Sequence, residues 1–245
     1  DAVAIVLPIP VQAAVVAQAL AAGKHVISEK PIASSRAEAL PLLELHRRRP
    51  ECVWMVAENW RYEEAFVRSA ELIRSGAIGR PLLAHWAQYS PIMRPGNKYA
   101  GSEWRRAGLF AGGLLLDGGV HHMAVLRMLL GEVTSAAAVV QQLAPELPPA
   151  DTLTATLAFA SGAQATYLTT FALGTPFGAP LVIVGERGSL RIERGRIEQA
   201  HGDEPVQVTE CGCYNGVDNE LIAFAAAIRT GAPHRNTPLE ALGDL

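Results

Sequence analysis

Apolar residues form continuous runs at residues 2–7 and 53–57, and residues 25–28, with Val26 and Ile27 at their centre, form a further short strand pattern between them. Runs of this length are typical of strands that are covered on both faces of a parallel sheet. Between them, residues 11–22 and 35–49 have the apolar spacing of helices. This alternation predicts βαβ crossovers, whose parallel strands bring their carboxyl ends to one ligand crevice.

The pattern changes after residue 80, where apolar and polar positions alternate in short segments joined by glycine-containing turns. We expect strands at residues 82–89, 133–142, 152–159, 163–171, 181–184 and 189–192, and helices at 63–75, 112–130 and 218–230. The fold class is therefore α/β followed by α+β, with helices packed on an antiparallel sheet.

Lys30 lies at the end of the second predicted strand, between Glu29 and Pro31. Pro31 disfavours helical torsions at Lys30 and holds it extended, where it can reach the crevice. The alternative is a solvated charge pair in a surface turn. Only three of the 21 basic residues are lysines, which makes a lysine at this position conspicuous.

Asp117 and His121 lie four residues apart in the predicted helix 112–130 and therefore share one of its faces. Gly118 and Gly119, between them, are poor helix formers. We expect their missing side chains to permit close approach of a ligand or of another part of the backbone.

Together, these motifs resemble those of the Gfo/Idh/MocA family of NAD(P)-dependent oxidoreductases. The resemblance follows the family's order over nearly the whole chain. It rests on Glu29-Lys30-Pro31, Glu58-Asn59-Trp60-Arg61-Tyr62, and segments 73–81, 112–121 and 219–245. The sequence at residues 7–10 and 103–105 is similar to that of a eukaryotic, fungal or algal branch of the family.

The resemblance implies two domains, a partial Rossmann domain for NAD or NADP at residues 1–58 and a substrate and oligomerisation domain at residues 59–245. The second would have a large, mostly antiparallel open sheet whose exposed face supports a homo-oligomer. The family's Gly-x-Gly-x-x-Gly turn, which holds the pyrophosphate, would lie upstream of Asp1. We therefore expect the sequence to be a segment that is inactive alone. Gln12 replaces the histidine of the family's Pro-x-x-His pattern, which leaves that contact open.

Three residues are expected to perform the chemistry of hydride transfer. His121 is the candidate acid–base residue, because an imidazole titrates near working pH and the family places this role here. Lys30 would hydrogen-bond the reacting oxygen and stabilise its negative charge. Asp117 would orient the imidazole or contact a substrate hydroxyl. The structural alternatives are a core histidine, a surface lysine and an exposed helix carboxylate.

Other residues are expected to line the crevice. The cofactor-binding candidates, from the ends of the predicted strands, are Leu7, Pro8, Pro10, Glu29, Lys30, Asn59 and Arg61. Arg61 has the alternative of pairing with Glu63 or Glu64. Tyr99, Trp104 and Arg105 are substrate-binding candidates, together with Asp117, because an aromatic ring and a guanidinium suit a polyhydroxylated ring. A packed Trp104 beside a solvated Arg105 is the alternative.

Composition excludes several classes of protein. The formal net charge of −3 gives no basic footprint for nucleic acid. No apolar run reaches the ~18 residues of a membrane span. The three cysteines and the scattered histidines lack the spacing of a disulfide framework or a metal site. A reducing, cytoplasmic location is expected, although a targeting peptide upstream is compatible with the sequence.

The sequence thus predicts an oxidoreductase that transfers a hydride between NAD(P) and a sugar, polyol or related hydroxy compound. Two alternatives share the same family. One is a dinucleotide-binding regulatory protein without turnover, and the other is an enzyme that cleaves glycosides with transient redox chemistry. The presence of Lys30, Asp117 and His121 favours catalysis.

Overall fold

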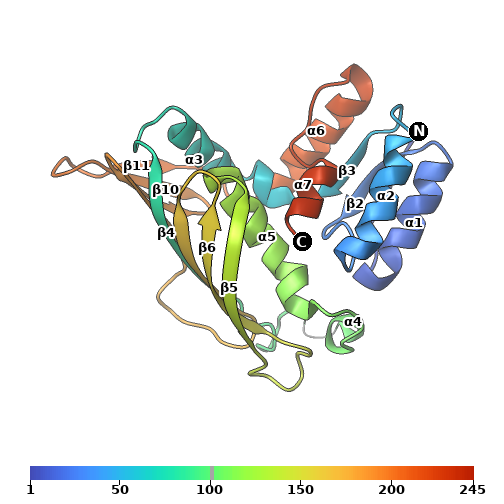
Figure 1. The fold of residues 1–245 in the computed structure, drawn as a ribbon, viewed down its shortest axis with the longest axis horizontal. Helices are drawn as coiled ribbons and strands as arrows, with labels where there is room; N and C mark the ends of the chain where they lie inside the picture. The colour runs from blue at the N-terminus through green and yellow to red at the C-terminus, as the bar shows by residue number, and fades with distance from the viewer. Residues whose placement is uncertain (100–101) are drawn as a thin grey trace.

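The chain folds around two separate sheets, a small parallel one and a large mixed one, with helices between them (Figure 1). The computed structural model describes residues 1–99 and 102–245. None of the described helices is long and apolar enough to cross a membrane.

The small sheet contains β1 (Ala2–Ile5), β2 (His25–Glu29) and β3 (Trp54–Ala57), all parallel and in that order. Helices α1 (Ile9–Ala21) and α2 (Arg36–Arg47) form the two crossovers. The predicted strand–helix alternation is confirmed. The predicted burial of the first strand is wrong: it ends at Ile5, and only Ile5 in it is buried, because β1 is the edge strand.

Local sequence explains where these helices begin. A proline occupies the first turn of α1, where its missing N–H costs no hydrogen bond. Ser35 caps α2 by accepting from the Glu38 amide at 3.3 Å. The Glu38 carboxylate accepts from the Ser34 amide at 2.8 Å, one residue before the cap, so both side chains fix the start of the helix.

The large sheet has eight strands in the order β11-β10-β9-β8-β4-β7-β6-β5. Only β4 and β7 pair in parallel, and all other neighbours are antiparallel. The strands are β4 (Pro81–Tyr89), β5 (Val133–Gln141), β6 (Thr152–Phe159), β7 (Gln164–Thr170), β8 (Leu181–Gly185), β9 (Ser189–Glu193), β10 (Arg196–Ala200) and β11 (Gln207–Glu210).

Helices α3 (Glu64–Arg74) and α5 (Gly113–Leu130) cover one face of this sheet (Figure 1). Phe66 of α3 and Leu126 of α5 pack with strand residues such as Ile183 in the main core. The opposite face remains open, and every residue of β5 after Val133 is exposed. The predicted open, mostly antiparallel sheet is confirmed.

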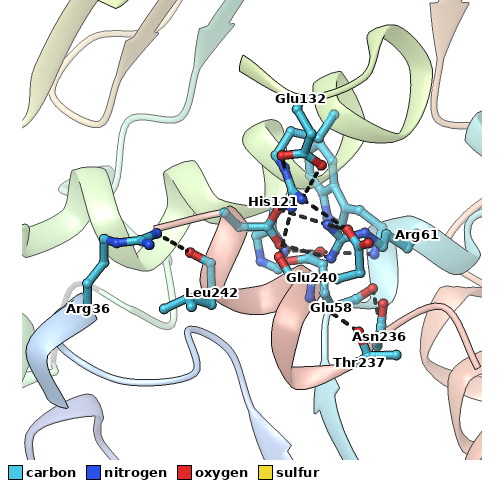
Figure 2. Close-up of polar contacts among 12 residues, drawn as sticks. Arg36, Glu58, Arg61, His121, Glu132, Asn236, Thr237, Glu240 and Leu242 are labelled. Carbon is cyan, nitrogen blue, oxygen red and sulfur yellow. Dashed lines mark hydrogen bonds and ion pairs between the residues drawn. The ribbon is translucent and has the colours of Figure 1, made fainter. Parts of the chain in front are cut away.

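The segment after the large sheet returns to the small one through α6 (Gly216–Thr230) and α7 (Pro238–Gly243). Helix α7 packs on the small sheet, where Ala241 and Leu242 join its core. Arg36 Nη1 donates to the Leu242 carbonyl at 3.1 Å (Figure 2). The C-terminal helix therefore stabilises the part of the fold that contains the parallel strands. A short α4 (Glu103–Arg106) precedes α5.

Candidate active site

The main cleft of the molecule lies between the carboxyl ends of the parallel strands and the N-terminal half of α5. Its volume is about 1230 Å³. Lys30, at the end of β2, lines it together with Asp117 and His121 of α5. The βαβ topology and one helix face thus bring together residues that are far apart in the sequence.

Lys30 and Arg105 converge on the Asp117 carboxylate. Lys30 Nζ donates to Asp117 Oδ1 at 2.8 Å and to the Asp117 carbonyl at 2.6 Å. Arg105 Nε donates to Asp117 Oδ2 at 2.7 Å. Burial acts to raise the pKa of Asp117, but the two cations outweigh it and hold the pKa below its usual value. Asp117 is therefore a fixed negative charge that orients two cations in the cleft.

His121 is held on two sides by residues that follow β3. Its Nδ1 lies 2.6 Å from Glu58 Oε1 (Figure 2), and its ring stacks on the Trp60 indole with centroids 5.3 Å apart and planes at 12°. Glu58 is 2% exposed. Burial acts to raise the pKa of Glu58, and the interaction with His121 together with the positive charges of Arg61 and Lys30 outweighs that effect and lowers it. An ionised Glu58 accepts the Nδ1 proton, which leaves the other ring nitrogen as the free base.

Gln12 of α1 positions the turn that carries Lys30. Its Nε2 donates to the Glu29 carbonyl at 2.7 Å and to the Pro31 carbonyl at 2.9 Å. The side chain is buried, and its Oε1 has no partner in the described chain. The sequence left the contact of Gln12 open. In the structure, Gln12 fixes the backbone on both sides of Lys30.

Glu220 of α6 is a cleft residue that the sequence did not single out. Burial, aided by the negative charges of Glu58 and Glu29, raises its pKa to about 8. Asn236 Nδ2 donates to the Glu58 carbonyl at 3.0 Å (Figure 2). It also donates to Glu220 Oε2 at 3.2 Å. Glu220 is thus mostly uncharged at neutral pH, although it faces the cleft.

The residues expected to bind the cofactor fall into two groups. Leu7, Pro8, Glu29 and Asn59 line the cleft together with Lys30, whereas Pro10 and Arg61 are not among its lining residues. Pro10 lies in the first turn of α1.

The expectation that Arg61 lines the cleft is wrong, and it does not pair with Glu63 or Glu64 either. It points to the opposite side of its turn, where Nη1 and Nη2 each donate to the Asp244 carboxylate at 2.8 Å. Arg127 of α5 donates to the same carboxylate at 2.6 Å. Glu240 pairs with both arginines, and Figure 2 shows it beside Arg61. Arg61 therefore fastens the end of the chain to the rest of the fold.

The residues expected to bind substrate lie together at the other end of the cleft. Tyr99, Trp104 and Arg105 all line it. The Arg105 guanidinium lies over the Trp104 ring at 4.1 Å and over the Tyr99 ring at 4.8 Å. Because Arg105 also binds Asp117, the alternative of a solvated arginine is wrong.

Two neighbouring residues of α5 have structural roles. His122 is buried, with Nδ1 2.5 Å from the Tyr167 hydroxyl, and burial lowers its pKa to about 3. A Cβ on Gly118 would come within 2.4 Å of the Phe171 ring. Gly118 therefore allows the aromatic ring, rather than a backbone segment, to approach the helix.

The cleft has the features required by the expected dinucleotide. It lies at the carboxyl ends of parallel strands, where α/β sheets bind nucleotides. It is larger than the ~300–1,000 Å³ of ordinary ligand pockets, which gives room for a dinucleotide and a substrate together. The residues present on this side, Leu7, Pro8, Glu29 and Asn59, offer apolar surface and hydrogen-bonding groups, so they fit such a cofactor.

Comparison with known proteins agrees with this arrangement. Residues 1–57 match the NAD-binding Rossmann fold of an oxidoreductase family, and residues 70–242 match the C-terminal alpha/beta domain of that family. Dehydrogenase FPY6 of Fusarium mangiferae is 35% identical over 254 residues, which cover 100% of this chain and 72% of the relative. This relative comes from the fungal branch that the sequence resembles.

Solved structures share the fold. An oxidoreductase from Thermotoga maritima superposes with a TM-score of 0.91 at 32% identity, covering 100% of this chain and 73% of the other. Levoglucosan dehydrogenase, solved with NADH and levoglucosan, has a TM-score of 0.87 at 23% identity, covering 98% and 74%. The chain belongs to the Gfo/Idh/MocA family of oxidoreductases, whose N-terminal unit is an NAD-binding Rossmann fold.

Proposed function

We propose that the protein is an NAD(P)-dependent oxidoreductase that interconverts a CH–OH group and a carbonyl in a sugar, polyol or related hydroxy compound. The observation that carries this proposal is the meeting of Lys30, Asp117 and His121 in a single cleft beside the ends of the parallel strands. Residues 1–58 would hold the dinucleotide, through Leu7, Pro8, Glu29 and Asn59, and residues 59–245 would hold the substrate.

The bound nicotinamide ring supplies the hydride acceptor for oxidation and the hydride donor for reduction. The chain must then manage one proton and the charge on one oxygen. Lys30 has its ammonium fixed by two bonds to Asp117, and its remaining donor can hydrogen-bond the reacting oxygen. A preorganised cation in a secluded cleft stabilises the alkoxide character that develops there.

His121 receives the hydroxyl proton during oxidation and returns it during reduction. Its Nδ1–H is donated to Glu58, so the free ring nitrogen is the base. The resulting imidazolium is stabilised by the ionised Glu58 and sits flat on Trp60. Asp117 acts on Lys30 and Arg105 and holds both cations in position for the substrate.

A homo-oligomer is proposed through the open face of the large sheet. Exposed apolar side chains on this face include Leu83, Val139 and Val184. Sedimentation of the full-length protein measures this directly: a Val139→Lys and Val184→Lys double variant is expected to shift the protein to a smaller species. An unchanged species would remove this face from the assembly.

The test of function is nicotinamide turnover by the full-length protein, with NAD and NADP, across a panel of sugars and polyols. Reduction of the cofactor by at least one hydroxy compound is expected. Tight dinucleotide binding without any turnover would instead identify a regulatory protein. Release of an aglycone from a glycoside, with no net change in the nicotinamide, would identify redox-assisted cleavage.

A further inference from the structure

The cleft carries a charge of opposite sign to that of the chain as a whole. The chain has a formal net charge of −3 and only three lysines, two of which, Lys30 and Lys98, line this cleft. The lining contains five basic side chains and three acidic ones. The basic ones are Lys30, Arg94, Lys98, Arg105 and Arg194, and the acidic ones are Glu29, Asp117 and Glu220.

The excess of positive charge lies at the substrate end of the cleft. Asp117 is one carboxylate shared between two cations, Lys30 and Arg105, so this group alone carries one uncompensated positive charge. Arg94 and Lys98 form no ion pair with any carboxylate in the part of the chain that the structure describes. Glu29 is at the strand-end side, so it does not neutralise this end.

Arg105 is built to present its donors in a fixed direction. Its ring contacts hold the guanidinium over Trp104 and Tyr99, and its Nη1 donates to Ser102 Oγ at 3.0 Å. Its Nη2 has no hydrogen-bond partner among residues 1–99 and 102–245. Lys98 Nζ also lies over the Tyr99 ring, 4.9 Å from its centroid. A planar guanidinium with a free Nη2 donor is well suited to bind a carboxylate.

We propose that the substrate is a hydroxy acid or sugar acid, whose carboxylate is bound by Arg105 with Arg94 and Lys98 while its carbinol carbon lies beside Lys30 and His121. This inference rests on the proposed redox function and specifies its substrate class. A single carboxylate matches the one uncompensated charge around Asp117. A phosphomonoester carries about −1.5 to −2 charges at neutral pH and is the competing anion in the test below.

The reaction is balanced by the groups already named. Oxidation breaks the carbinol C–H bond, with the hydride passing to the nicotinamide, and transfers the hydroxyl proton to His121. The carboxylate takes no part in bond making. It provides binding energy remote from the reacting carbon, equally in the ground state and the transition state, and therefore acts on KM.

The test compares uncharged and acidic probes of the same carbon skeleton with the full-length protein and both nicotinamide cofactors. Suitable sets are D-glucose, D-gluconate, D-glucuronate and D-glucose 6-phosphate, and the corresponding galactose compounds. Calorimetry in the presence of the cofactor measures binding whether or not turnover occurs. At least one acid is expected to bind about 10-fold more tightly than its neutral partner at low salt. The preference should shrink at ~1 M salt, where the Debye length is ~3 Å.

The double substitution Arg94→Gln and Lys98→Gln isolates the charge. It should raise KM for the acid about 10-fold. Both kcat and KM for the dinucleotide should stay close to the wild-type values. Arg106→Gln is the matched control, since Arg106 lies on α4 beside Arg105 but is exposed and does not line the cleft. It should leave both KM values unchanged.

The outcomes separate this inference from the proposed function. Neutral sugars that bind as tightly as their acids, a preference for the phosphate ester, or no binding of any acid would overturn the acidic substrate. Nicotinamide turnover with neutral probes alone would retain the redox function and reject the acid. Salt-sensitive binding of an acid without turnover of any probe would support the anion site and count against the redox function.

Discussion

Glu58→Gln tests how far the base depends on its buried carboxylate. The substitution preserves size and removes one negative charge at a residue that is 2% exposed and lies 2.6 Å from His121 Nδ1. A hydrogen bond to a charged group contributes about 1.5–3 kcal/mol. At about 1.4 kcal/mol for each tenfold in rate, its loss when the imidazolium forms lowers kcat about 10- to 150-fold.

The amide adds a second effect. If its NH₂ faces Nδ1, the ring proton moves to the cleft-facing nitrogen and the base is lost. KM for the dinucleotide should stay within about 2-fold of wild type, because Glu58 is not in contact with the cleft. Steady-state kinetics of the full-length protein measure both constants. Asp151→Asn is the control: it also neutralises a buried carboxylate, but one that binds the Leu143 and Ala144 amides instead.

The lowered pKa of Glu58 also fixes the direction in which folding stability changes with pH. The pKa of Glu58 is lowered in the folded protein, so its ionised form adds stability above the ordinary value of 4.5, and this contribution is lost as the pH falls through the lowered value. Glu58→Gln should lack that acid-side loss of stability. An unchanged kcat, or an equal loss of kcat in Asp151→Asn, would refute the positioning role of Glu58.

Three further substitutions probe other groups. Lys30→Met should lower kcat about 10²–10³-fold while changing the thermal midpoint little, since Asp117 keeps Arg105; parallel losses of activity and stability would indicate a structural lysine. Asp244→Ala leaves Arg61 and Arg127 buried without that carboxylate, so denaturant titration should show a loss of about 3–5 kcal/mol. Leu239→Ala, in the helix that ends just before Asp244 but 70% exposed, should cost under about 0.5 kcal/mol; a loss as large as that of Asp244→Ala would show that the ion-pair cluster does not stabilise the fold. The raised pKa of Glu220 means that stability falls as the pH rises from 4.5 through about 8; Glu220→Gln should flatten this decline, and an unaltered pH profile of the thermal midpoint would contradict it.

Hydrophobic pattern was sufficient to predict the main architecture because most elements bury a regular apolar face. Helix α5 was predicted within one residue, since its apolar run stops at Gly131, which adopts φ 92. Strands β10 and β11 were missed because their sequences, RIEQA and QVTE, are mostly polar; β11 is the edge strand and β10 lies beside it. Helix α7 was missed because six residues are too few to show a helical period.

The site was only partly predictable, for reasons that particular residues illustrate. Asn59 and Arg61 occupy one 3-10 turn, and a sequence cannot show that their side chains leave it in different directions. Glu58 was quoted as part of a motif but received no role, because its partner His121 lies 63 positions away. Glu220 gave no local signal, since its burial depends on residues far away in the sequence, such as Asn236, which donates to its carboxylate.

The central claim is that His121 is the proton-transfer group of a nicotinamide-dependent redox centre, and single-turnover hydride transfer by His121→Ala tests it most directly. With the dinucleotide and substrate both saturating, the rate constant should fall about 10²–10⁴-fold, while calorimetry shows unchanged dinucleotide binding. A wild-type rate constant in the variant would contradict the claim.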